Sequence, residues 1–158
     1  MDFLENDGIR DWCIERGFAL GPKSELIIDP AERVLECRGY GQQADPEGQE
    51  VEIAEWSVGN LKDWDECLLW VTSWGVWPSS ENWPGYYKAR GDQGERRSLE
   101  IAPGHLFTAV ESELLKHFLR LVLENAWDAH VLPARGGRGS GTHALVSHDE
   151  WVEIRASG

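Results

Sequence analysis

The sequence predicts a single α+β domain, residues 1–158, in which a mostly antiparallel sheet packs against a central helix at about 108–125 and against shorter helices. Three observations support this prediction. The length of 158 residues is close to the commonest domain size. Short apolar runs of strand character are separated by turn-forming residues. One strongly apolar segment opens with the capping-box pattern Thr108-Ala-Val-Glu111, which is typical of a helix start.

The first expected element is a short amphipathic helix at about 7–16. Apolar residues recur in it at helical spacing, Asp7 is suited to the N-cap, and Gly17 is suited to ending the helix.

Two short apolar runs come next, at 26–28 and 34–37. The Asp29-Pro30 step between them favours a turn, so we expect a hairpin, with a helical second run as the alternative. Residues 39–48 contain glycine, glutamine, aspartate and proline with almost no apolar content, which predicts an exposed loop inside the domain.

Two segments in the middle of the chain are both predicted as strands. Residues 51–56 alternate in the way of a partly solvated strand. Residues 67–74 are more apolar and β-branched, which predicts a central strand buried on both faces. A helix is the alternative for this second run, because Trp70, Trp74 and Trp77 would then form one stripe.

Two helices are expected between this strand and the C-terminal third. The first runs from the Ser79-Ser80 pair, a source of N-caps, to Arg90, and it tolerates Pro84 only in its first turn. Gly91 is expected to end it. The second is the central packing helix, whose apolar residues cover most of its circumference. These are Val110, Leu114, Leu115, Phe118, Leu119, Leu121, Val122 and Leu123.

The C-terminal third is expected to be mainly strands. Residues 127–132 and 143–146 have strand character on either side of the glycine-rich loop 136–141. That loop lacks the Gly-Lys-Ser/Thr ending of a phosphate-binding loop, so we interpret it as a hairpin loop. A second capping box at 147–150 predicts a helical turn, and 151–155 form the last strand.

The charge of the chain is uneven. The formal net charge is −13, of which residues 1–66 carry −11. Because proteins that follow phosphates neutralise them with Lys and Arg, this charge argues against binding to nucleic acid or to an anionic membrane. A basic protein is the complementary partner.

The expected compartment and redox state follow from the length of the apolar runs, the first residues and the cysteines. No apolar run approaches the roughly 20 residues that a membrane helix needs, and residues 1–7 lack the pattern of a secretory signal. We therefore expect a cytoplasmic protein. Cys13, Cys37 and Cys67 are odd in number and widely spaced, which predicts reduced, buried side chains.

Six of the nine tryptophans fall in one stretch of the chain. They are Trp56, Trp64, Trp70, Trp74, Trp77 and Trp83. Trp70 and Trp74 lie in an apolar run and are expected in the core, whereas Trp56 and Trp64 lie among acidic residues and can meet a partner. The remaining two flank a proline-serine turn and fit either role.

These observations favour a protein-binding function. In size and charge the chain is like the bacterial immunity proteins and antitoxins that neutralise a basic partner, an analogy that does not extend to any sequence motif. Acidic residues would steer the partner and a tryptophan would anchor it. The predicted partner-binding residues are Glu50, Glu52, Glu55, Trp56, Asp63, Trp64, Asp65 and Glu66.

The alternative is a metal-assisted hydrolase or another enzyme. Asp128 and His130 would share one strand face, and His143 on a paired strand would complete a two-histidine, one-carboxylate site. The common hydrolase and zinc-binding motifs do not occur in the sequence. We therefore assign no catalytic residue, no metal ligand and no cofactor from the sequence alone.

Overall fold

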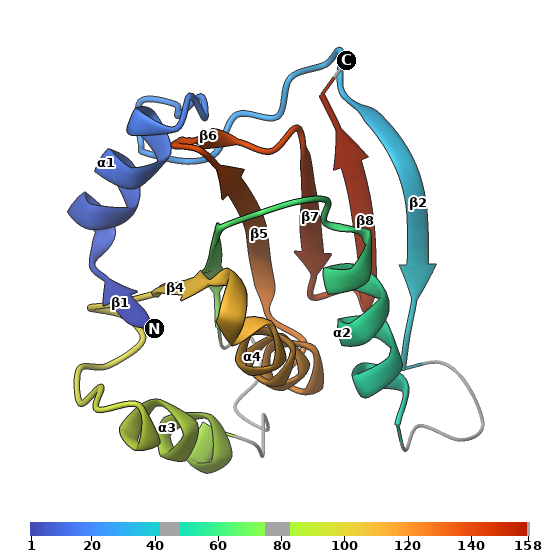
Figure 1. Cartoon of the computed structure of the whole chain (residues 1–158). Coiled ribbons are helices and arrows are strands. Elements are labelled where there is room, and N and C mark those ends of the chain that lie inside the picture. Colours follow the sequence, from blue (N-terminus) through green and yellow to red (C-terminus); the bar gives the residue numbers. More distant parts are fainter. Residues whose placement is uncertain (42–47, 75–82, 158) are drawn as a thin grey trace.

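The computed structural model of the protein describes residues 1–41, 48–74 and 83–157 (Figure 1). Within them an antiparallel sheet is covered by helices, which confirms the predicted α+β fold class. The helices are α1 (Asn6–Glu15), α2 (Gln49–Asn60), α3 (Trp83–Asp92) and α4 (Ser112–Glu124), with a 3-10 turn at Ala109–Glu111. The strands are β1 (Asp2–Leu4), β2 (Arg33–Gly39), β3 (Glu66–Ser73), β4 (Gly104–Thr108), β5 (Asp128–Arg135), β6 (Arg138–Gly139), β7 (Thr142–Ser147) and β8 (Trp151–Ala156).

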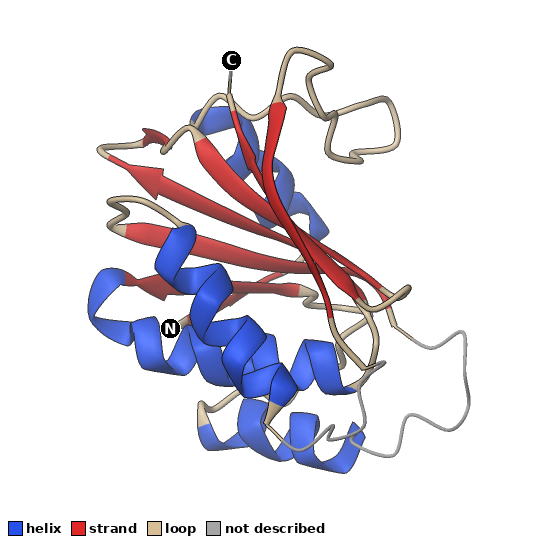
Figure 2. Ribbon diagram, turned by 90° about the vertical axis from the view of Figure 1, so that its right-hand side faces the viewer, coloured by secondary structure: helices blue, strands red, loops and turns tan. Residues whose placement is uncertain are grey.

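The sheet has the strand order β1-β4-β3-β5-β7-β8-β2, and the short β6 pairs with β5. Figure 2 shows helices on both sides of the sheet. On one face α4 and α2 pack against each other and cover the larger core. On the other face α1 covers a smaller core over β3 and β5. None of the described helices is both long and apolar enough to cross a membrane.

Strand β3 lies between β4 and β5, as predicted for a central strand, and the helical alternative is wrong. Cys67, Leu69 and Val71 are fully buried and belong to the larger core. Leu68 and Trp70 point the other way, into the smaller core. The alternation of a strand therefore explains why an unbroken apolar run is needed here.

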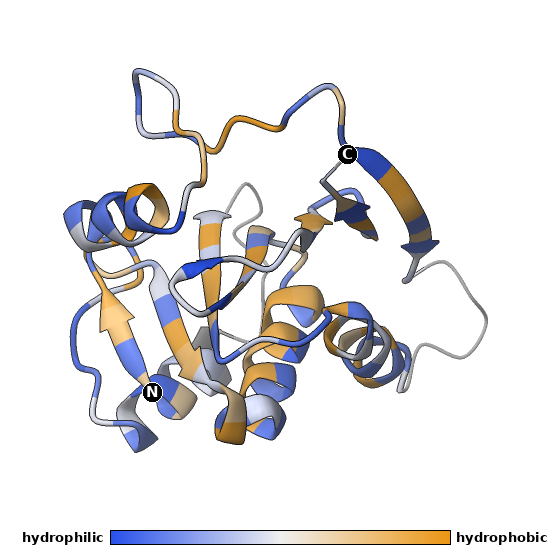
Figure 3. Cartoon of the chain, turned by 45° about the horizontal axis from the view of Figure 1, so that its top comes forward, coloured by the Kyte–Doolittle hydropathy of each residue, from blue (hydrophilic) through white to orange (hydrophobic). Residues whose placement is uncertain are grey.

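The central packing helix is confirmed. The backbone N–H of Thr108 donates to Glu111 Oε2 at 2.8 Å and completes the predicted capping box. The first turn is 3-10, and α4 proper follows it with a buried face that includes Leu115 and Phe118. Figure 3 shows apolar and polar residues alternating around this helix. The prediction that Val110 belongs to the apolar surface is wrong, because Val110 lies in the 3-10 turn and its side chain is 94% exposed.

Residues 51–56 are part of helix α2, so the predicted strand is wrong. The buried positions are Ile53, Ala54, Ser57 and Val58, which is the spacing of one helix face. The alternation of apolar and polar residues that predicted a strand covers only the first half of residues 51–56. Acidic side chains in the first turn also favour a helix, because they face the positive end of its dipole.

The predicted hairpin between 26–28 and 34–37 is also wrong. The second run forms β2, which pairs with β8 and not with the first run, and this rules out the helical alternative too. Leu26 makes only an isolated bridge to Leu20. The first run therefore belongs to a segment that crosses the outer face of the sheet, defined here as the strap, residues 17–32.

Most of the other predicted elements are confirmed to within a few residues. Helix α1 ends before Gly17, whose φ of 82° fits a helix stop, but Asp7 lies in the first turn and does not cap it. Strands β5, β7 and β8 match their predicted runs. Helix α3 extends past Gly91 to Asp92. Most of the predicted 39–48 loop, Trp77 and the Ser79-Ser80 pair lie outside the described residues.

The second predicted capping box, at 147–150, forms no helical turn. It is the tight connection of the β7–β8 hairpin, in which the N–H of Asp149 donates to Ser147 Oγ at 3.1 Å. Cysteine burial is also partly as predicted. All three thiols are free, and Cys13 and Cys67 are buried, but Cys37 is exposed because β2 lies at the sheet edge.

A buried guanidinium joins α3 to the rest of the fold. The Arg90 side chain donates to the carbonyl oxygens of Ala102 and Arg97, each at 3.1 Å, and lies over the ring of Phe3 at 4.9 Å. Its Nη1 is also 3.1 Å from His105 Nε2. Burial, and next the charge of Arg90, lowers the pKa of His105 to about 3, so this imidazole is neutral.

We expect Trp70→Ala to lower the free energy of unfolding by about 3–5 kcal/mol, because its indole is buried between β3 and α1. Urea unfolding measures this change. The matched control is Val110→Ala, which should cost less than about 0.5 kcal/mol because that side chain is exposed. Equal, small losses in both variants would show that the Trp70 indole is not part of the core.

Candidate functional site

An acidic, aromatic surface lies along α2 and the neighbouring edge strand β2. Glu52 and Glu55 are exposed on the helix, and neither forms an ion pair within the described residues. Trp56 lies one helical turn from Glu52 and is half-buried. Its indole N–H donates to Glu36 Oε2 at 3.3 Å. We define the α2 face as Glu36, Glu52, Glu55 and Trp56.

The indole of Trp56 is held from two directions. Its inner edge packs against the larger core, and the guanidinium of Arg38 lies over the ring at 4.6 Å from its centre. This contact shows that the ring already accepts a cation on its face. A side chain fixed in this way loses little conformational freedom on binding, which is a property of good interface anchors.

Glu50 lies in the first turn of α2 but is turned partly inward. It is half-buried and lies close enough to Tyr40 for its charge to act on the phenol. Burial, followed by the charges of Glu150 and Glu50, raises the pKa of Tyr40 well above its usual range. Of the predicted residues on α2, Glu52 and Glu55 are therefore the freer carboxylates.

The other predicted residues follow the C-terminal end of α2, and their carboxylates are engaged within the chain. Glu66 Oε2 accepts from Arg16 Nε at 2.9 Å. Asp65 Oδ2 accepts from the N–H of Gly136 at 2.9 Å. Asp63 lies 3.2 Å from the guanidinium of Arg135 in an exposed pair.

Trp64, in the same segment, is half-buried against the larger core. The structure thus divides the predicted set into a free half on α2 and an internally paired half at the start of β3. Only the half on α2 offers unpaired carboxylates beside an anchored indole.

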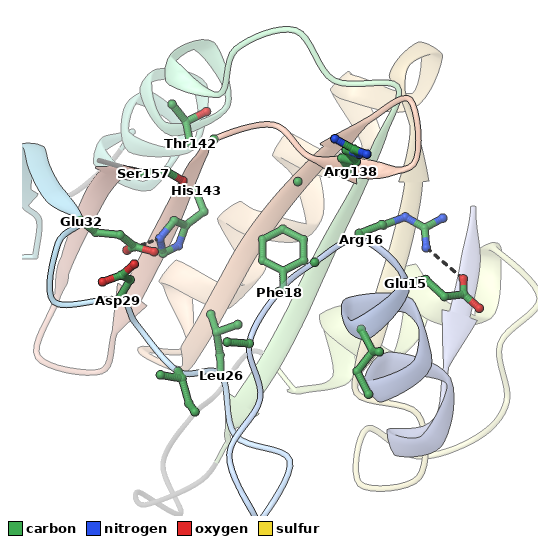
Figure 4. Close-up of a pocket in the computed structure, with 16 residues that line it drawn as sticks. Glu15, Arg16, Phe18, Leu26, Asp29, Glu32, Arg138, Thr142, His143 and Ser157 are labelled. Carbon is green, nitrogen blue, oxygen red and sulfur yellow. Dashed lines mark hydrogen bonds and ion pairs between the residues drawn. The ribbon is translucent and has the colours of Figure 1, made fainter.

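The outer face of the sheet contains a cavity of about 610 Å³ between α1, the strap and β7 (Figure 4). Phe18 and Leu26 of the strap form part of its apolar wall. At one end, Glu32 Oε2 lies 2.7 Å from His143 Nε2, and both side chains are largely buried. His143 Nδ1 is buried without a hydrogen-bond partner in the described part of the chain.

A second cavity of about 330 Å³ lies on the other side of the strap. Trp70, Trp74 and His130 line it, together with Lys23 from the strap. The ring of His130 is 5.5 Å from that of Trp70, and its Nδ1 is buried with no partner among the described residues. Leu26 lines both cavities, so the strap separates them.

The predicted metal-site residues are not gathered into one site. Asp128 Oδ1 accepts from the backbone N–H of His148 at 2.7 Å and lies 2.9 Å from its Nδ1. His130 and His143 line different cavities, on either side of the strap. Across residues 1–41, 48–74 and 83–157, no three His, Cys, Asp or Glu side chains are arranged to hold a metal ion.

Sequence reasoning missed the Glu32–His143 pair and the role of Glu36. Glu32 and His143 are far apart in the chain, and neither lies in a motif. The sequence places Glu36 in a hairpin with residues 26–28, whereas the pairing of β2 with β8 brings it to Trp56. Neither contact leaves a signal in one sequence.

Comparisons with protein families, with curated proteins and with solved structures find no match to this chain.

We expect acid to destabilise the fold through His130. Burial, and next the nearby His143, lowers its pKa from 6.5 to about 4, while Asp128 acts in the opposite direction. Between these two values the unfolded chain binds more protons, so the contribution of His130 to stability is fully present above about pH 6.5 and is lost as the pH falls towards 4. The loss is on the order of 3 kcal/mol, from about 1.4 kcal/mol per pKa unit.

Urea unfolding at about pH 7 and about pH 5 compares the wild type with His130→Asn, which does not titrate. The variant should lose less stability over this interval, although His105 contributes a parallel loss in both proteins. Identical losses in the two proteins would contradict a depressed pKa at His130.

Proposed function

We propose that this chain is an acidic protein-binding module that neutralises a basic protein partner, in the manner of an immunity protein or antitoxin. The observation that supports it most is the α2 face, where unpaired carboxylates of Glu52 and Glu55 lie beside the fixed indole of Trp56. The excess of negative charge in residues 1–66 supports the same proposal.

Binding would proceed in two physical steps. The net charge of −13 attracts a cationic surface over distances of about a Debye length, roughly 8 Å at physiological salt. On contact, Trp56 fills a pocket of the partner, and a Lys or Arg side chain pairs with Glu52 or Glu55. Because the indole is held by Glu36 and Arg38 beforehand, little ordering is needed.

The alternative, a hydrolase that uses Asp128, His130 and His143, has weaker support. Asp128 is occupied by His148, and the two histidines open to different cavities. The Glu32–His143 pair is a carboxylate–imidazole couple of the kind used in acid–base chemistry, but the described residues around it give no further reason to choose that reaction class.

We expect Glu52→Lys and Glu55→Lys to weaken partner binding by roughly tenfold each, because each replaces attraction with repulsion. The matched control is Glu100→Lys, which makes the same change in net charge at an exposed position beyond α3. Immobilised wild type and variants are exposed to lysate at low and high salt, and retained proteins are identified by mass spectrometry. A basic protein should be retained by the wild type and control at low salt only.

The two other outcomes of this assay are informative. Equal losses in Glu55→Lys and Glu100→Lys would mean that total charge acts and the α2 face does not. Retention that does not change with salt would contradict electrostatic steering altogether.

The anchor is tested separately with Trp56→Ala. We expect a loss of binding of about 2 kcal/mol or more, as for an interface hot spot, measured by titration calorimetry with the partner so identified. A melting curve of the same variant shows how much of the effect is loss of packing against the larger core. Unchanged affinity in a folded variant would remove Trp56 from the site.

A further inference from the structure

Strand β2 is the last strand of the sheet, and every one of its residues is exposed. Among the described strands it pairs only with β8. The N–H of Tyr40 donates to the carbonyl of Glu150 at 2.8 Å, so the backbone of Tyr40 faces β8. Because these groups alternate along a strand, Gly39 and Cys37 direct their N–H and C=O groups away from the sheet.

This edge carries charged side chains and one register shift, between Val34 and Glu36, but it lacks two other common protections. It contains no proline and no lysine, and it exposes Val34 by 46% and Leu35 by 51%. Figure 3 shows β2 as an alternation of hydrophilic and hydrophobic residues along the rim. A row of unpaired backbone groups with exposed apolar side chains is suited to receiving another strand.

The charges of β2 specify which strand fits. Glu36 and Arg38 lie on the same side of the strand and form an exposed ion pair at 3.1 Å. In an antiparallel pair of two β2 strands with Cys37 opposite Cys37, each Glu36 lies directly opposite Arg38 of the other copy. A register centred one residue earlier places Glu36 opposite Glu36 of the other copy. A register centred one residue later places Arg38 opposite Arg38 of the other copy, and like charges directly opposite one another are destabilising.

We propose that β2 pairs with β2 of a second copy of this chain, antiparallel and in the register centred on Cys37. Two copies then share one continuous sheet, related by a twofold axis perpendicular to it. The outward groups of Cys37 are the ones such a central pair uses. Four side chains, two of Glu36 and two of Arg38, alternate in charge above the junction.

This interface has a consequence for the α2 face. Helix α2 contacts β8 on one side of the sheet, and the twofold axis keeps that side the same in both copies. The two α2 helices therefore flank the junction, and their acidic faces form one larger surface. Glu36 belongs both to the strand pair and to the α2 face, but the dimer does not rest on the proposed function, since Glu52 and Glu55 lie outside the strand pair.

Sedimentation equilibrium of the whole chain tests the proposal with charge variants. The wild type should form dimers at micromolar concentration. Glu36→Arg and Arg38→Glu should each weaken self-association by roughly tenfold or more, because each sets like charges opposite one another. Mixing the two variants should restore dimers, since every cross-strand pair in the mixed dimer is again of opposite sign.

Cys37 supplies a second measurement. A short bismaleimide should join two wild-type chains through Cys37, because Cys13 and Cys67 are buried. Cys37→Ser should abolish the product, Arg38→Glu should reduce it, and mixing with Glu36→Arg should restore it. Circular dichroism and melting curves verify that the variants fold, which matters because Arg38 also contacts Trp56.

A monomeric wild type at high micromolar concentration would overturn the proposal. A dimer that survives both charge reversals, or that mixing does not restore, would also overturn it, because the register would then be different. A monomer that still retains a basic partner through Glu52 and Glu55 would reject the dimer and leave the proposed function standing.

Discussion

The burial of β3 on both faces is the constraint on which the rest of this structure depends. An apolar strand in the middle of a sheet needs a covering layer on each side, because water would otherwise reach its side chains. On one side α4, joined by α2, supplies the layer. On the other side α1 and the strap supply it, and they cover less of the sheet, so both cavities lie along the strap. The α2 face and the cavities are thus on opposite sides of one sheet.

The fold was predictable where the signal is local. The capping box at Thr108 and Glu111 and the apolar run of β3 each specify their element within a few residues. The wrong predictions concern elements whose signal extends over a longer stretch of sequence. The helical period of α2 becomes visible only when Ser57 and Val58 are included, and a short window admits a strand. The partner of β2 is β8, more than a hundred residues away, which no turn signal indicates.

The candidate site was predictable in composition but not in detail. The excess of acid and the clustered tryptophans are visible in the sequence. Which carboxylates remain free depends on partners brought close by the fold. Glu66 and Glu52 look alike in the sequence, yet Glu66 binds Arg16 and Glu52 forms no ion pair in the described chain. The contact between Trp56 and Glu36 is not visible in the sequence either, because the two residues lie far apart along the chain.

The placing of β1 and β2 has a consequence for how the chain folds as it is synthesised. Both strands come from the first forty residues, yet they form the two opposite edges of the sheet. Strand β2 pairs with β8, so it has no partner until residues 151–156 have left the ribosome. Until then the backbone groups of β2 that pair with β8 have no strand partner. Pairings of such high contact order form late, so both edges of β2 stay exposed to aggregation for most of the synthesis of this chain.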